Sequence, residues 1–217
     1  MLEGSPNLLG ILVAVGLVGI FPLAVVTMTG FLKISVVLFL IRNALGVQQT
    51  PPNLVLYGIA LVLTVYVTTP LISEISGRLE ERQVTFQTTE DLSVAAQVVR
   101  EPLRQHLLRF THPAEREFFL EGTARLWPDG ANQNLQESDL SILVPAFVAS
   151  ELTRAFEIGF LLYLPFLVID IVVANVLMTL GMIMVSPVLI SIPLKLFLFV
   201  AIDGWSRLMH GLILSYG

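Results

Sequence analysis

Long uncharged apolar stretches alternate along the chain with a single polar segment in its middle. The first apolar stretch runs from about residue 8 to 32, and the second runs from about Leu54 to Ile72. A helix of about 20 apolar residues crosses the roughly 30 Å hydrocarbon core of a bilayer, so each stretch can be one span. The pattern therefore predicts a first hydrophobic hairpin over residues 1–73, with its turn in the polar, proline-containing segment 42–53.

The last third of the chain, residues 141–217, is apolar again and too long for one span. A glycine and a proline bound a methionine-rich break at 181–187, which predicts a third segment at about 155–181 and a fourth at about 187–214. Together they form a second predicted hairpin with its turn at the break. The preceding stretch, 142–154, contains charges and a proline, so we expect it to lie at an interface or to pack on protein.

Most of the charge lies in the polar insert between these hairpins. Residues 74–140 hold 7 of the 12 basic and 12 of the 17 acidic side chains. Apolar residues recur there at three- or four-residue spacing, which predicts an amphipathic helix; they are Leu92, Ala96, Val99, Leu103, Leu107 and Phe110. Pro113 suits the first position of a second helix. The insert is therefore predicted to be a small helical module.

The composition sets the protein class. Of 217 residues, 55% are hydrophobic and 13% are charged, against roughly 25% charged in a soluble domain. This balance excludes a soluble enzyme, a nucleic-acid binder with a basic stripe, and a disordered chain. There is no cysteine, and His106, His112 and His210 lack the spacing of metal ligands. We expect an all-α membrane protein without enzymatic activity, cofactor or metal.

Orientation follows from the basic residues near the first hairpin turn. Lys33 precedes this turn and Arg42 begins it, and no acidic residue lies near them. By the positive-inside rule, this places the turn in the cytoplasm and the 74–140 insert on the opposite side. The N-terminus is acidic and then uncharged from Gly4 to Leu32. This favours a retained transmembrane segment over a cleaved signal peptide.

Charged residues inside apolar segments are candidates for function, because each costs roughly 2.5–3.5 kcal/mol to insert. Asp170 and Lys195 interrupt the third and fourth segments, and Lys33 follows the first. One hypothesis is a proton relay through Asp170, as in a proton-coupled secondary transporter. The favoured interpretation is an interhelical pair of Asp170 with Lys195 or with Lys33 that sets packing or subunit register.

Glu151, Arg154 and Glu157 are spaced by three residues, so a helix places them on one face. They form either a local ion-pair ladder or a contact with another subunit, and the spacing leaves both open.

Met178, Met182 and Met184 gather around the 181–187 break. Methionine is flexible and fills irregular gaps, and in a break between membrane helices it is also suited to an apolar constriction. Trp127, Trp205 and Tyr216 fit either anchors at the membrane–water interface or simple packing, and the anchor role is favoured for Trp205 and Tyr216.

Short motifs follow one another in a fixed order along nearly the whole chain. They are Arg42-Asn43-Ala44-Leu45-Gly46, Pro51-Pro52-Asn53, Leu143-Val144-Pro145-Ala146-Phe147, Ser150-Glu151-Leu152, Ala155-Phe156-Glu157-Ile158-Gly159-Phe160, Tyr163-Leu164-Pro165-Phe166, Val168-Ile169-Asp170, Gly181-Met182-Ile183-Met184-Val185-Ser186-Pro187, Pro193-Leu194-Lys195 and Asp203-Gly204-Trp205. In this order they resemble the FliP/YscR/SctR family of the bacterial type III secretion export apparatus. Only the insert matches the family loosely.

The resemblance implies a function and an assembly. Members form a pentamer with S/FliQ-type and T/FliR-type proteins, together with U/FlhB-type and V/FlhA-type components. The resulting helical export gate passes unfolded protein substrates through a pore in the inner membrane. Its helices are bent hairpins, largely lifted out of the bilayer plane, and the insert faces the periplasm.

The resemblance also assigns residues. It implies a pore constriction at Met182, Ile183 and Met184, where many members have methionine at the middle position. It favours inter-helix or inter-subunit pairing for Glu151, Asp170 and Lys195. Flagellar members commonly have a cleaved signal peptide and a longer N-terminal extension, which this sequence lacks, so the resemblance is closer to the injectisome branch.

Overall fold

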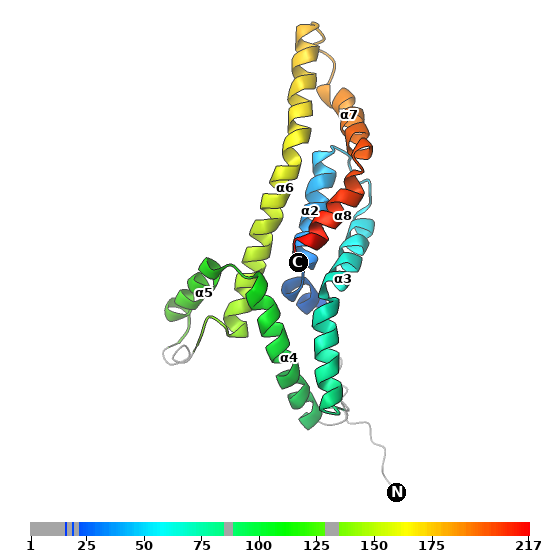
Figure 1. Cartoon of the computed structure of the whole chain (residues 1–217). Coiled ribbons are helices and arrows are strands. Elements are labelled where there is room, and N and C mark those ends of the chain that lie inside the picture. Colours follow the sequence, from blue (N-terminus) through cyan, green and yellow to red (C-terminus); the bar gives the residue numbers. More distant parts are fainter. Residues whose placement is uncertain (1–15, 17–18, 20–21, 85–88, 129–134) are drawn as a thin grey trace. The chain divides into compact units, whose positions relative to one another are not determined.

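In the computed structural model, the described part of the chain consists mainly of helices (Figure 1). The structure describes residues 16, 19, 22–84, 89–128 and 135–217, and no strand occurs within them. A short helical stretch, Pro22–Met28, precedes the labelled helices. These are α2 (Phe31–Ala44), α3 (Asn53–Glu81), α4 (Thr89–Phe110), α5 (Pro113–Leu126), α6 (Leu140–Thr179), α7 (Pro187–Ala201) and α8 (Gly204–Leu214). The predicted all-helical fold class is confirmed.

Two helices, α3 and α6, are each long and apolar enough to cross a membrane. The number rises to four if Pro22–Met28 with α2, and α7 with α8, are each counted as one broken span. This agrees with the membrane class predicted from the composition.

Helix α6 is longer than the third predicted segment. It begins at Leu140 and continues without a break through 142–154. This stretch packs on protein, as predicted, because Ile142, Leu143 and Phe147 are buried. The predicted start of the third segment, at about residue 155, was wrong because it followed hydropathy. Charged residues such as Glu151 and Arg154 interrupt an apolar run, but glutamate and arginine are good helix formers and leave the backbone helical.

The fourth predicted segment, 187–214, was expected to be one span and is instead two helices. Helices α7 and α8 meet at a 63° bend. Asp203 lies at this bend with a φ of 53°, in the left-handed region that ends a helix. The Asp203-Gly204 dipeptide at the bend is a turn signal that the hydropathy pattern alone did not use.

The first predicted segment also ends elsewhere. Its end near residue 32 was wrong, because α2 begins at Phe31 and continues to Ala44. Within this segment, residues 8–15, 17–18 and 20–21 lie outside the described ranges. The apolar positions Ile34, Val37, Leu38 and Ile41 are almost completely buried. Their i, i+3, i+4, i+7 spacing gives α2 one continuous apolar face.

The chain divides into two compact units. The first unit contains the described part of residues 1–30 together with 68–151, and the second unit contains 31–67 and 152–217. Helices α3 and α6 each contribute residues to both. These units do not test the predicted division of the sequence into two hairpins and an insert, which stays a prediction.

In the first unit, α4 and α5 confirm two predictions. The insert is helical, with α4 passing through Pro102, and Pro113 begins α5 at its first turn. The expected buried face of α4 was wrong in its first half, because Ala95 and Val98 are buried while Ala96 is exposed. Most residues between 94 and 99 are apolar, so they fit two neighbouring faces of the helix equally well. Their spacing alone therefore could not show which face is buried.

Candidate functional site: a buried ion pair, a methionine turn and an apolar pocket

Three helices of the second unit meet at the amino group of Lys195. Its Nζ atom donates to Oδ2 of Asp170 at 2.6 Å and to the carbonyl oxygen of Ala44 at 3.1 Å. Lys195 lies on α7, Asp170 on α6, and Ala44 is the last residue of α2. The final carbonyls of a helix lack partners within it and form its negative end, so a lysine is well placed there. Lys195 therefore links α2, α6 and α7.

Of the two pairings that the sequence left open, the structure has Asp170 with Lys195. Lys33 is buried at 1% exposure, and its Nζ atom lies 3.5 Å from the centroid of the Tyr216 ring. This is a cation–π contact, which gains strength when it is shielded from water. Tyr216 is itself buried, which agrees with packing, the other role that the sequence left open for this residue.

The charged residues near the start of the apolar part of α6 differ in environment. Glu151 is completely buried, Arg154 is half-buried and Glu157 is exposed. Glu157 takes part in no ion pair within the part of the chain that the structure describes. The three side chains therefore do not form one uniform solvated ladder, and the sequence spacing did not indicate this difference in burial.

The break between α6 and α7 is a well-formed turn. Gly181 has a φ of 72°. Its N–H donates to the carbonyl oxygen of Met178, and the N–H of Met182 donates to the carbonyl oxygen of Leu177 at 2.9 Å. These two bonds form a Schellman motif, which ends a helix with a left-handed residue. Pro187 then occupies the first turn of α7, where its missing N–H leaves no bond unmade.

The side chains of this turn extend outward. Exposure is 42% for Met182, 85% for Ile183 and 101% for Met184. We call residues 181–187 the methionine turn. Water around fully exposed apolar side chains is unfavourable, so a cluster of them marks a contact with protein or lipid.

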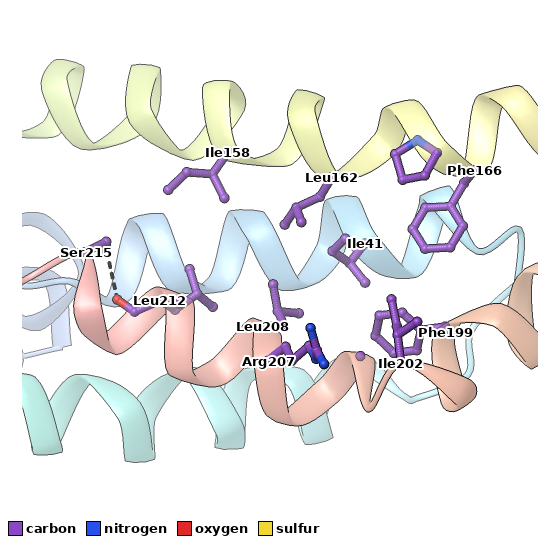
Figure 2. Close-up of a pocket in the computed structure, with 13 residues that line it drawn as sticks. Ile41, Ile158, Leu162, Phe166, Phe199, Ile202, Arg207, Leu208, Leu212 and Ser215 are labelled. Atoms are coloured by element: carbon purple, nitrogen blue, oxygen red, sulfur yellow. Dashed lines mark hydrogen bonds between the residues drawn. The ribbon is translucent and has the colours of Figure 1, made fainter.

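The second unit also contains an apolar pocket of about 480 Å³ (Figure 2). Residues of α2, α6, α7 and α8 line it, among them Ile41, Leu162, Phe166 and Leu208. Arg207 contributes the one charged side chain in this lining. The sequence pattern did not mark Arg207 as part of a site. The signal that could have indicated this site is a charged residue, Arg207, within an apolar segment and four residues before Gly211.

Metal-binding geometry does not occur in the described part of the chain, which holds no group of three or more His, Cys, Asp or Glu side chains. His106 lies in the first unit against the rings of Phe110 and Phe147. Burial lowers the pKa of His106, and the nearby charge of Arg109 lowers it further.

Comparison with known proteins adds the family. The model of the FliP family matches residues 14–212. This chain belongs to the FliP family. It is 52% identical over 216 residues to the probable translocation protein y4yL of Sinorhizobium fredii, covering 100% of this chain and 97% of the relative.

Other relatives of this FliP-family protein have names from virulence systems. It is 45% identical to the Yop proteins translocation protein R of Yersinia pestis, with 98% of each chain covered. It is 42% identical to the virulence protein YscR of Salmonella typhimurium, with 99% of each covered. The protein is thus a member of the type III secretion export family with relatives of the injectisome type, which confirms the resemblance seen in the sequence.

Proposed function

We propose that this protein is a pore-forming subunit of the type III secretion export gate in the bacterial inner membrane. Unfolded protein substrates pass through a channel lined by five copies together with S/FliQ-type and T/FliR-type proteins. U/FlhB-type and V/FlhA-type components act beside it. The protein is not an enzyme, so the energy for transport comes from other components. The 74–140 insert faces the periplasm.

The observation that carries this proposal is the exposure of the methionine turn. Ile183 and Met184 extend from a short, hydrogen-bonded turn with almost no contact to the rest of their own unit. Thioether side chains are unbranched and adapt their shape to what they meet. Several such turns around a common axis form a soft apolar ring, which blocks hydrated ions when empty and yields to a passing chain.

The exposed apolar surface of α6 supports an assembled state. Large side chains on several faces of this helix are more than half exposed, including Phe156, Phe160, Leu161, Ile171 and Val176. A helix that is apolar all round is normally covered by protein or lipid. Sibling subunits cover part of this surface, and Glu151, Arg154 and Glu157 contribute charged contacts at its start.

The Asp170–Lys195 pair has a structural role in this proposal. Lys195 is held by two acceptors on two other helices, so the pair fixes how α7 packs beside the methionine turn. No observation favours the alternative function, a proton-coupled secondary transporter that uses Asp170.

The test replaces the methionine turn's side chains. Met182→Ala with Met184→Ala in the full secretion apparatus should increase ion leakage across the inner membrane while the helices remain folded. Met178→Ala is the matched control, because Met178 is 63% exposed but lies on α6 before the turn. Leakage is measured as the decay of an imposed proton or ion gradient in cells, and export is measured by the amount of secreted substrate.

If the double variant leaks no more than the Met178→Ala control and secretes normally, the constriction is not formed by these residues. Native mass measurement of the detergent-extracted complex tests the assembly separately. A monomer without higher assembly in the presence of its partners would contradict the gate proposal.

A further inference from the structure

The apolar pocket of the second unit is too large to be a packing defect. Protein interiors contain few voids larger than a water molecule, whereas ligand pockets measure about 300–1,000 Å³. This pocket has a volume of about 480 Å³. Its size is that of a binding site.

Gly211 on α8 is one of the residues that line the pocket. A Cβ atom built on Gly211 meets nothing within 4 Å, so any larger residue would extend into free space. The opposite holds for Gly204, which also lines the pocket, because a Cβ atom there would collide with the ring of Phe199. The walls are thus close-packed at the bend between α7 and α8, and the hollow begins one to two turns further along α8.

Arg207 gives this apolar pocket its one charge. Figure 2 shows its side chain beside those of Leu208 and Ile202 at the α8 wall. The residue is exposed, and within the described residues its guanidinium group forms no ion pair. A guanidinium group offers paired donors that match a phosphate or carboxylate group.

An apolar hollow with an unpaired arginine at its wall is complementary to an amphiphile with an anionic head group. The pocket is lined partly by α6, one of the two helices that can cross a membrane on their own. Membrane lipids are therefore the amphiphiles that reach it, and basic pockets between membrane helices bind anionic head groups.

We propose that the pocket binds one acyl chain of an anionic phospholipid, with the lipid phosphate on the guanidinium group of Arg207. The acyl chain lies between α6 and α8, against Leu162, Phe166 and Leu212. This site goes beyond the proposed export function. It holds whether or not the methionine turn forms a constriction, because the two features share no residue.

Native mass spectrometry of the purified full-length chain tests the site by titration with two lipids. Phosphatidylglycerol and phosphatidylcholine with identical oleoyl chains differ in head-group charge only. The wild-type chain should bind phosphatidylglycerol roughly tenfold more tightly, as expected for one charge-assisted contact. Arg207→Gln should remove this preference, while Arg125→Gln on the exposed part of α5 should keep it.

Filling the pocket tests the acyl chain. Gly211→Leu should reduce the binding of both lipids, because its side chain occupies the hollow without a collision. Gly58→Leu is the matched control, since Gly58 also has open space at its Cβ atom but lies on α3 outside the pocket lining. Glycerol 3-phosphate at millimolar concentration should not displace the lipid. Displacement would mean that the site binds a free phosphate only.

Trp205 provides a second measurement that is independent of mass. Its indole lies edge-on against Phe199 in the pocket wall, with the ring centroids 5.3 Å apart. The chain has two tryptophans, so a Trp127→Phe background leaves Trp205 as the sole reporter. Phosphatidylglycerol with brominated acyl chains should quench its fluorescence more strongly than brominated phosphatidylcholine, and Gly211→Leu should relieve this quenching.

Equal binding of the two lipids by the wild-type chain, or quenching that Gly211→Leu leaves unchanged, would overturn the proposal. A change in oligomeric state caused by Gly211→Leu, with lipid binding unaffected, would overturn it in favour of a second copy of the chain in the pocket. Helix content by circular dichroism verifies that each variant is folded before either measurement.

Discussion

Lys195 and Asp170, 25 residues apart in sequence, lie in direct contact with Nζ and Oδ2 separated by 2.6 Å. The lysine side chain is 6% exposed and the aspartate side chain 37% exposed. Removing one member of a buried pair leaves the other charge without compensation, whereas removing both avoids that cost. The pair is therefore expected to show strong coupling.

Lys195→Met should lower the free energy of unfolding by roughly 1–3 kcal/mol, below the usual cost for a fully buried pair because Asp170 is partly exposed. Asp170→Asn should also destabilise the protein. The double variant should lose less stability than the sum of the losses in the two single variants. A double-mutant cycle from thermal unfolding in detergent measures the coupling. Additive effects would show that the two charges do not stabilise each other.

Two glycines of the second unit are predicted to tolerate no side chain. A Cβ atom on Gly159 would collide with the side chain of Leu40, and one on Gly204 would collide with the ring of Phe199. Gly159→Ala and Gly204→Ala should each cost about 1–3 kcal/mol of stability, as overpacking does. Gly58→Ala, where the space is open, should instead stabilise α3 by about 0.5–1 kcal/mol. Melting temperatures in one detergent compare all three, and an equal shift for all would contradict the packing.

Acid should weaken the first unit through His106. Burial, and then the charge of Arg109, lower the pKa of His106 below its usual value. The unfolded chain therefore binds this proton more readily than the folded chain does. Stability is unaffected by His106 above about pH 6.5, the ordinary pKa of histidine, and falls as the pH drops from there toward the lowered folded pKa.

The measurement for His106 is the melting temperature from pH 8 to 5 in the wild type and in His106→Leu. The variant should lose less stability on acidification, because leucine keeps the contact with Phe110 and Phe147 without a titrating group. His210→Leu, at an exposed position on α8, should leave the acid response of the wild type unchanged. A parallel decline in wild type and His106→Leu would exclude His106 as the cause.

The turn between α2 and α3 depends on Arg42. Its Nη1 atom donates to the carbonyl oxygen of Pro51 at 3.2 Å and to Oδ1 of Asn53 at 2.6 Å. Arg42→Lys retains the charge but loses the planar group that reaches both acceptors. It should lower the free energy of unfolding by about 1 kcal/mol, and Asn53→Ala should do the same. Asn43→Ala, at the adjacent exposed position, should have little effect on thermal unfolding.

The sequence predicted the helical class and both helices of the insert, because hydropathy, proline positions and apolar spacing act locally. It also located the methionine turn, since Gly181 and Pro187 mark the end of one helix and the start of the next. These features depend on a few neighbouring residues. Local patterns were sufficient for them.

The misjudged features depend on contacts between distant residues. The break at Asp203 carries an Asp-Gly turn signal, but the close approach of Gly204 to Phe199 that accompanies it is a contact between two helices. Charged residues inside an apolar segment indicated importance but did not select partners, so Asp170 could have paired with Lys33 as well as Lys195. The pocket was not predicted at all, because a hollow between four helices has no signature in any one of them.

The length of α6 has a consequence for how the protein meets the bilayer. Its 40 residues extend about 60 Å at 1.5 Å per residue, twice the roughly 30 Å of a hydrocarbon core. Tilting absorbs only a modest hydrophobic mismatch. Lipid tails therefore cover at most about half of an upright α6, and the first turns, in which Leu143 and Phe147 are buried against the protein itself, need no lipid contact.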